Sequence, residues 1–140
     1  MPEVVVFDAA LDPYSADSRV TRRLALRADE TLVALHRLIQ EAFEWDDDHL
    51  YSFWLDGTFW GDKRSEYTAP FELEESGAAS ADVEIERLGL ERGQRVAYVF
   101  DFGDEWRVVL KVREIRDGGE TGILERKGEP PPQYPDLDEE

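Results

Sequence analysis

Residues 95–115 have the sequence RVAYVFDFGDEWRVVLKVREI, and this stretch decides the fold. Apolar side chains alternate with other residues in both of its halves, a pattern typical of β-strands that bury one face. Residues 102–104, Phe-Gly-Asp, separate the halves with a tight-turn sequence, so the stretch predicts a β-hairpin. The predicted buried face carries Val96, Tyr98, Phe100, Phe102, Trp106, Val108, Leu110 and Val112, and the other face of the second strand carries Arg107, Val109, Lys111 and Arg113.

Residues 31–45, TLVALHRLIQEAFEW, predict one amphipathic helix. Apolar side chains recur there at steps of three and four residues and form a single stripe. Either Asp29 or Thr31 is expected to supply the N-cap side chain. The acidic run at residues 46–48 would place like charges at the negative end of the helix dipole, so the helix is expected to end near Trp45.

The order of the remaining elements indicates the fold class. Residues 63–81 show no regular pattern. The sequence predicts an α+β fold, a mostly antiparallel β-sheet of about five or six strands with one main amphipathic helix packed on one face. Residues 1–128 form a single domain in this interpretation, and residues 129–140 form a Pro-rich acidic tail that is expected to be flexible. Three further strands are expected, at residues 4–7, 20–26 and 49–55.

Composition and charge exclude several kinds of protein. The 140 residues include no cysteine, which excludes disulfides, thiolate metal sites and a cysteine nucleophile. Because 33 acidic residues face 16 basic ones, the formal net charge is −17, and nucleic acid or anionic membranes are unlikely partners. A local positive patch around Arg22 and Arg23 is compatible with that charge. The sequence shows no signal peptide and no membrane-spanning stretch, so a cytoplasmic location is expected.

Three blocks of sequence occur together in a recognisable order. They are TLVALHRLIQ, FEW and HLYSF within residues 31–53, YVFDFGDEW at residues 98–106, and the pair Arg22-Arg23 before an apolar strand. In order and spacing, over roughly residues 4–115, these blocks resemble the plasmid pRiA4b ORF-3-like family. The resemblance implies a small α+β fold and, for some relatives, an association with plasmids or insertion elements. It supplies no known activity.

Three positions depart from the pattern of that family. Val108 stands where relatives usually carry a histidine, and Thr21 stands where they carry a tryptophan. Residues 128–135, GEPPPQYP, lack the acidic pair and the glycines of the relatives' C-terminal segment. A site that depended on those groups would be lost or rebuilt in this chain.

Asp101 and Asp104, on either side of the hairpin turn, are the first candidates for chemistry. A carboxylate pair can bind a divalent metal or act in acid–base catalysis, but aspartates also cap the N–H groups of turns. His49 follows the acidic run at residues 46–48 and is a further candidate metal ligand, although the spacing matches no zinc or calcium motif. A solvated run of charge is the alternative. No cofactor is predicted, and a divalent metal remains a hypothesis.

The remaining candidates are histidine, aromatic and arginine side chains. His36 borders the apolar stripe of the helix, where it is either a packed core residue or a ligand. Trp106, together with the other tryptophans, belongs either to the core or to a recognition surface, and Trp60, beside a turn, is expected to be the most exposed. Candidate functional side chains also include Arg22, on the apolar parity of its strand, and Arg23 and Arg107, which point the other way.

The leading hypothesis is a non-enzymatic binding or accessory module with a protein partner. The lack of a recognisable catalytic motif, the many aromatic residues and the tail favour it. The alternative is a small metal-dependent enzyme that uses a carboxylate site around Asp101 and Asp104, with His49 as a possible ligand. A nucleic-acid accessory factor acting through Arg22 and Arg23 is a third hypothesis, which the net charge disfavours. The sequence predicts no oligomeric state.

Overall fold

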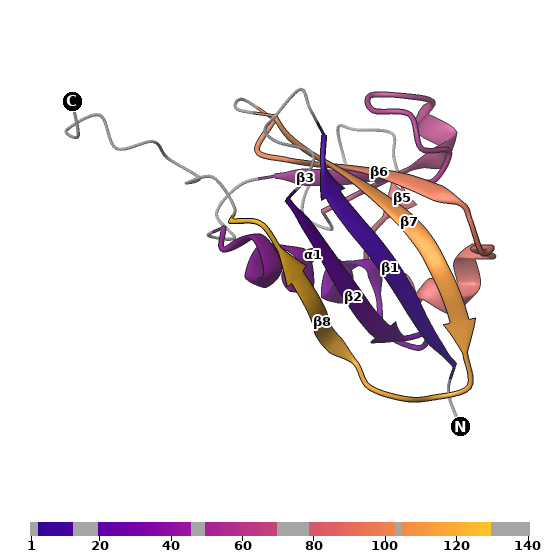
Figure 1. Cartoon of the computed structure of the whole chain (residues 1–140). Coiled ribbons are helices and arrows are strands. Elements are labelled where there is room, and N and C mark those ends of the chain that lie inside the picture. The colour runs from indigo at the N-terminus through magenta and orange to yellow at the C-terminus, as the bar shows by residue number, and fades with distance from the viewer. Residues whose placement is uncertain (1–2, 13–19, 46–49, 70–78, 103–104, 130–140) are drawn as a thin grey trace, which may run out of the picture.

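The computed structural model describes residues 3–12, 20–45, 50–69, 79–102 and 105–129. Within them, one sheet of eight strands packs against one α-helix (Figure 1). The strands are β1 (Val4–Leu11), β2 (Thr21–Arg27), β3 (Tyr51–Trp54), β4 (Glu66–Thr68), β5 (Ala79–Ser80), β6 (Arg95–Phe100), β7 (Trp106–Arg116) and β8 (Gly122–Lys127). Their order across the sheet is β5-β4-β3-β6-β7-β1-β2-β8.

Helix α1 (Leu32–Phe43) covers one face of the sheet, as its apolar stripe predicts. Thr31 is the N-cap, because its side chain accepts a hydrogen bond from the backbone N–H of Ala34. The helix ends where Glu44 adopts a left-handed conformation, with φ of 60°. The predicted end near Trp45 is therefore confirmed to within two residues, whereas the acidic run at residues 46–48 lies outside the described residues.

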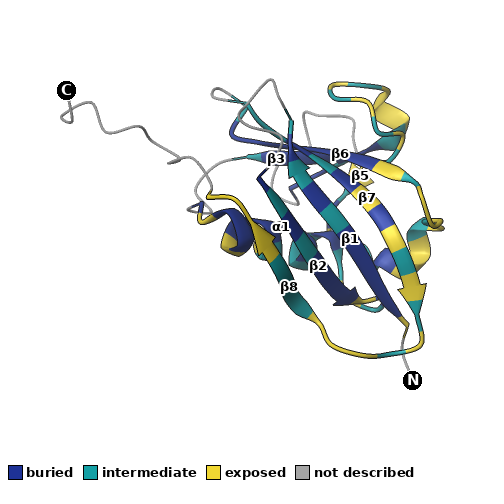
Figure 2. Cartoon of the chain, in the orientation of Figure 1, coloured by how far each residue is buried: buried dark blue, intermediate teal, exposed yellow. Residues whose placement is uncertain are grey.

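The predicted hairpin is confirmed, since β6 and β7 pair antiparallel from Arg95 opposite Lys111 to Phe100 opposite Trp106. Burial alternates along β7, which Figure 2 shows as alternating colours. Alternate apolar side chains of both strands pack in the main core with α1, namely Val96, Tyr98, Phe100, Val108, Leu110 and Val112. The predicted placement of Phe102 on this face is wrong, because Phe102 packs with Trp54, Ala97 and Val99 on the other face. The largest fully buried members of that core are Phe7, Leu11, Leu24, Leu32, Leu35, Ile39, Phe43, Phe53, Ile85, Tyr98 and Phe100.

The sheet is larger and more varied than predicted. It has eight strands rather than five or six, and β4 pairs with β5 in parallel. Residues 63–81 were predicted to be irregular, but they contribute a short 3-10 helix (Lys63–Ser65) as well as β4 and β5. Strand β8 was not predicted, because GILERK has too few apolar residues to alternate visibly. Pairing with β2 makes it a strand.

Residues 130–140 of the predicted tail lie outside the described residues. In the part of the chain that the structure describes, no helix combines the length and the apolar character needed to cross a bilayer.

Candidate binding surface

The face of the sheet opposite α1, here called the outer face, gathers basic side chains. In β7, Val108, Leu110 and Val112 are buried toward the helix, so the residues between them point outward. The register of the neighbouring strands brings further basic residues beside them, although the net charge of the chain is −17. The basic residues of the outer face include Arg23, Arg95, Arg107, Lys111, Arg113 and Lys127.

One end of the outer face is aromatic. Trp54 is fully buried against Ala97 and Val99, and Trp60 lies on it with the ring centroids 5.2 Å apart. Phe102 meets Trp60 edge-on at 5.1 Å. Trp60 keeps 44% of its surface exposed, which confirms the prediction that it is the most exposed tryptophan. Together these residues form the aromatic patch: Trp54, Phe59, Trp60 and Phe102.

A tight loop holds Trp60 on this surface. Its backbone is left-handed, with φ of 56°, which is an uncommon conformation for a bulky residue. The N–H of Gly61 donates to the carbonyl of Thr58 at 3.1 Å, and a Cβ at Gly61 would lie only 2.8 Å from that oxygen. Backbone strain of this kind costs roughly 1–3 kcal/mol and concentrates at functional sites.

Arg107 connects the aromatic patch to the basic part of the outer face. Its guanidinium lies 5.1 Å from the centroid of the Phe59 ring, in cation–π geometry. Its Nε donates to the Glu105 carboxylate at 2.8 Å, so the side chain is fixed on both sides. Arg107 therefore points to the outer face, as predicted.

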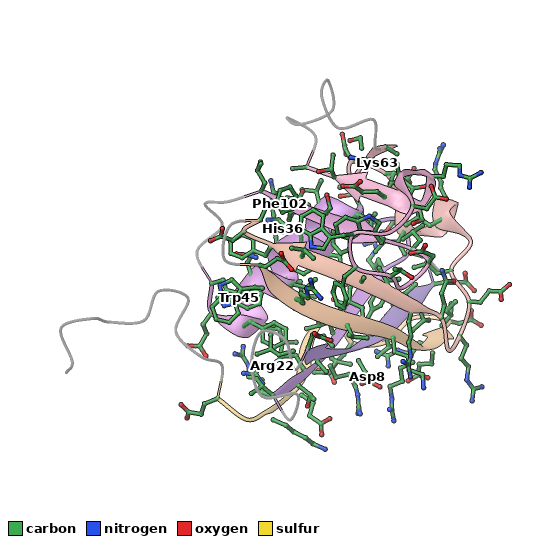
Figure 3. The ribbon with its side chains drawn as sticks, turned by 90° about the horizontal axis from the view of Figure 1, so that it is seen from above. Asp8, Arg22, His36, Trp45, Lys63 and Phe102 are labelled. Carbon is green, nitrogen blue, oxygen red and sulfur yellow. The ribbon has the colours of Figure 1, made fainter. Side chains whose placement is uncertain are left out.

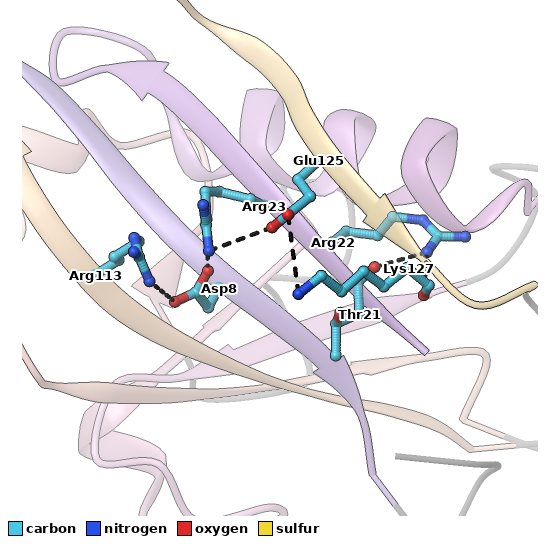
Figure 4. A network of polar contacts seen from close by, with 7 residues as sticks. All are labelled: Asp8, Thr21, Arg22, Arg23, Arg113, Glu125 and Lys127. Carbon is cyan, nitrogen blue, oxygen red and sulfur yellow. Dashed lines mark hydrogen bonds and ion pairs between the residues drawn. The ribbon is translucent and has the colours of Figure 1, made fainter. Parts of the chain in front are cut away.

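A row of five charged residues crosses the outer face from β6 to β8, one residue per strand. In the middle of the row, Asp8 accepts from Arg23 at 3.1 Å and from Arg113 at 3.2 Å, and Arg23 also reaches Glu125 at 3.3 Å (Figure 4). The hydrogen bond to Asp8 raises the pKa of Arg23 above its ordinary value. This charge row, in order of the strand register, is Arg95, Lys111, Asp8, Arg23 and Glu125.

An open groove of about 410 Å³ runs beside the charge row. Its floor is low because Ala10 lies opposite Val109 on one side and opposite Thr21 on the other, and all three side chains are short. The charged side chains around it are Asp8, Arg23, Arg95, Lys111, Glu125 and Lys127, whereas Arg22 also lines it but turns its side chain toward α1. The groove therefore has more cationic than anionic groups on its walls.

The face toward α1 holds a buried polar cluster. The His36 ring stacks on Tyr51 with centroids 3.5 Å apart, and its Nδ1 lies 2.8 Å from the hydroxyl of Tyr98. Gln40 donates to the same hydroxyl at 2.9 Å. Figure 3 labels His36 and Trp45, which lie toward the helix, and Asp8, which lies on the other side of the sheet. His36 is thus a packed, hydrogen-bonded core residue.

Arg22 is also buried, on the helix side of β2. Its Nε donates to the carbonyl of Ala42 at 2.8 Å, and its Nη1 donates to those of Thr21 at 2.6 Å and Lys127 at 2.9 Å. Burial lowers the pKa of this guanidinium, and Arg126 lowers it further. Arg22 connects the last turn of α1 to β2 and β8, which is a structural role.

The comparison with protein families decides where the chain belongs. The sequence model of the plasmid pRiA4b ORF-3-like proteins matches residues 4–133. The chain belongs to this family. The match extends beyond the blocks at residues 31–53 and 98–106 that carry the resemblance, and it includes β8.

A solved structure has the same fold as this pRiA4b ORF-3-like protein. It is the crystal structure of a protein of unknown function, MM3350 from Methanosarcina mazei Go1, with a TM-score of 0.73. The two chains are 20% identical, and the match covers 95% of this chain and 74% of that chain. At this identity the likeness concerns the fold alone. No curated protein matches the chain.

The blocks shared with the family contribute mainly to the core. Trp106 is partly buried and lies with its ring centroid 5.5 Å from that of Trp45. The indole N–H groups of Trp45, Trp54 and Trp106 are buried and have no acceptor among the described residues. Trp106 therefore packs on the helix side and does not join the aromatic patch.

Of the three candidate metal ligands, the described residues include Asp101. Asp101 is buried, adopts a left-handed backbone with φ of 63° and follows the last residue of β6. Asp104 and His49 lie outside the described residues. Among the residues that are described, no group of three or more His, Asp or Glu side chains is placed to hold a metal ion.

Sequence reasoning did not predict the charge row as a unit. Lys111 and Arg113 were expected to point outward, and Arg23 likewise, but Arg95, Asp8 and Glu125 were not candidates. Alternation indicates which face a side chain occupies, whereas the neighbours depend on strand order. The central position of β1, between β7 and β2, brings these residues together.

Proposed function

We propose that this pRiA4b ORF-3-like protein is a non-enzymatic binding module that holds a protein partner on its outer face. The observation that carries the proposal is Trp60, an exposed tryptophan held in a strained conformation. Tryptophan is enriched among the residues that dominate the energy of protein interfaces. The rings of Trp54 and Phe102 fix it from two directions, so little conformational entropy is lost when a partner covers it.

The charges beside the aromatic patch indicate the chemistry of the partner. Arg107 lies against Phe59, and Arg95 lies at the start of β6, near the loop that carries Trp60. In that loop, a Cβ at Gly57 would lie 3.1 Å from the carbonyl oxygen of Arg95. A complementary segment would place an apolar side chain on Trp60 and acidic residues near the two arginines. The proposed partner is therefore a protein segment of mixed apolar and acidic character.

Trp60→Ala tests the docking surface, and Ile115→Ala is its matched control. Ile115 is the other exposed large hydrophobic residue among those described, 38% exposed on β7. We expect Trp60→Ala to weaken binding of the partner at least about 30-fold, because truncating a central aromatic anchor costs ~2 kcal/mol or more. Ile115→Ala should bind within about twofold of the wild type.

The measurement begins with crosslinking of the tagged wild type in native lysate, followed by titration calorimetry with each protein recovered. A partner whose affinity falls only with Trp60→Ala, and whose crosslinked segment is acidic and apolar, supports the proposal. Equal affinities for both variants, or no protein enriched by the wild type, would overturn it. Melting curves of both variants show whether the fold is intact.

A further inference from the structure

The charge row contains two positive charges that face each other. Arg95 and Lys111 are directly opposite in the antiparallel pair of β6 and β7. Like charges at such positions destabilise a sheet, whereas opposite charges stabilise it. On its other side Lys111 is opposite Asp8, but that carboxylate is hydrogen-bonded to Arg23 and Arg113. Among the described residues, neither Arg95 nor Lys111 forms an ion pair.

The rest of the row alternates in sign. Asp8 lies between cations, Arg23 lies between Asp8 and Glu125, and Lys127 approaches Glu125 to 3.9 Å. The alternation fails only between Arg95 and Lys111. An anionic group above these two residues would continue the alternation and remove the repulsion between them.

The groove gives such a group a place to bind. Arg95 and Lys111 both line it, and its volume of about 410 Å³ lies within the range of small-molecule sites. The short side chains of Ala10 and Val109 leave room beside the two head groups. Both cationic residues are exposed, so an anion reaches them from solvent without any rearrangement of the sheet.

We propose that this groove binds a phosphoryl group between Arg95 and Lys111. A phosphoryl group carries about −1.5 to −2 charges at pH 7 and offers three acceptor oxygens, which matches two unbalanced cations. The guanidinium of Arg95 can donate two parallel hydrogen bonds to it, and the ammonium of Lys111 contributes a compact charge. The uncharged part of the ligand lies over Ala10 and Val109. Arg95 also lies near the aromatic patch, but the phosphoryl site needs no protein docked there.

The test titrates the full chain, at constant ionic strength, with inorganic phosphate, a small sugar phosphate, a phosphoserine peptide and succinate. Calorimetry and the amide shifts of Val109 and Ala10 report binding. The variants are Arg95→Gln and Lys111→Gln. Arg27→Gln is the matched control, because Arg27 is exposed on β2, paired with Asp29, and does not line the groove.

We expect both groove variants to lose roughly tenfold or more in phosphate affinity, since each loses a hydrogen bond between charged groups, while Arg27→Gln keeps the wild-type value. Without phosphate, Arg95→Gln should melt at the same temperature as the wild type or higher, because the repulsion is gone. A purely structural role for Arg95 predicts the opposite shift.

The probe that binds most tightly shows which kind of molecule carries the phosphoryl group. Tighter binding of the sugar phosphate supports a small phosphorylated molecule, and tighter binding of the peptide supports a phosphorylated protein at the same site. Succinate that binds as tightly as phosphate would overturn the phosphoryl assignment. The site itself is overturned if no probe binds, or if binding survives in both groove variants.

Discussion

Tyr98→Phe is expected to lower the free energy of unfolding by about 2–6 kcal/mol, although it removes only one oxygen atom. The hydroxyl of Tyr98 is the common partner of Gln40 Nε2, at 2.9 Å, and His36 Nδ1, at 2.8 Å. All three side chains are buried. Each polar group that loses its buried partner costs about 1–3 kcal/mol, so the two costs together give the expected range.

Urea denaturation measures this change, with Tyr67→Phe as the matched control. Tyr67 lies on β4, is only partly buried and has no hydrogen bond of its hydroxyl among the described residues. The control should change stability by less than about 0.5 kcal/mol. In the double variant Tyr98→Phe, Gln40→Leu, part of the loss should be recovered, because the orphaned amide is removed as well. A loss at Tyr98 no larger than at Tyr67 would show that the cluster contributes nothing.

Arg22→Leu is expected to destabilise the protein by a similar amount, about 2–4 kcal/mol. The substitution removes the donor from the carbonyl of Ala42, where the hydrogen bond is buried, and from that of Lys127, where it is partly buried. It also removes a positive charge from the negative end of the α1 dipole. Removing a buried charge recovers part of its desolvation cost, which limits the net loss.

The neighbouring arginine provides the control for this experiment. Arg23→Gln breaks ion pairs to Asp8 and Glu125, but its side chain is 30% exposed, so the cost should stay below about 1 kcal/mol. Hydrogen exchange should show faster opening of β8 and of the last turn of α1 in Arg22→Leu only. Equal effects of the two substitutions would contradict the structural role assigned to Arg22.

The elements that depend on local pattern were predictable. The stripe of α1 and the β6–β7 hairpin follow from residues close in sequence, and the sequence narrowed the N-cap to Asp29 or Thr31, of which the structure has Thr31. The parity of β2 also places Arg22 correctly on the side of the helix. Its acceptors were not predictable, because Ala42 and Lys127 lie 20 and 105 positions away.

In the candidate site, too, local features could be predicted from the sequence, whereas contacts between distant residues could not. Exposure of Trp60 follows from its place beside a turn, but its contacts with Trp54 and Phe102 depend on how the loop returns to the sheet. The burial of His36 depends on Tyr98, 62 positions away. The charge row could be predicted only from the order of the strands in the sheet, which no local pattern provides.

The central position of β1 determines when this chain can fold. During synthesis β1 leaves the ribosome well before strand β7, one of its two neighbours in the sheet, which spans Trp106–Arg116. Until β7 emerges, one edge of this apolar strand is unpaired, and unpaired strand edges favour aggregation and chaperone binding. Pairing so distant in sequence also makes loop closure costly, so refolding in vitro should be slow for a domain of this size.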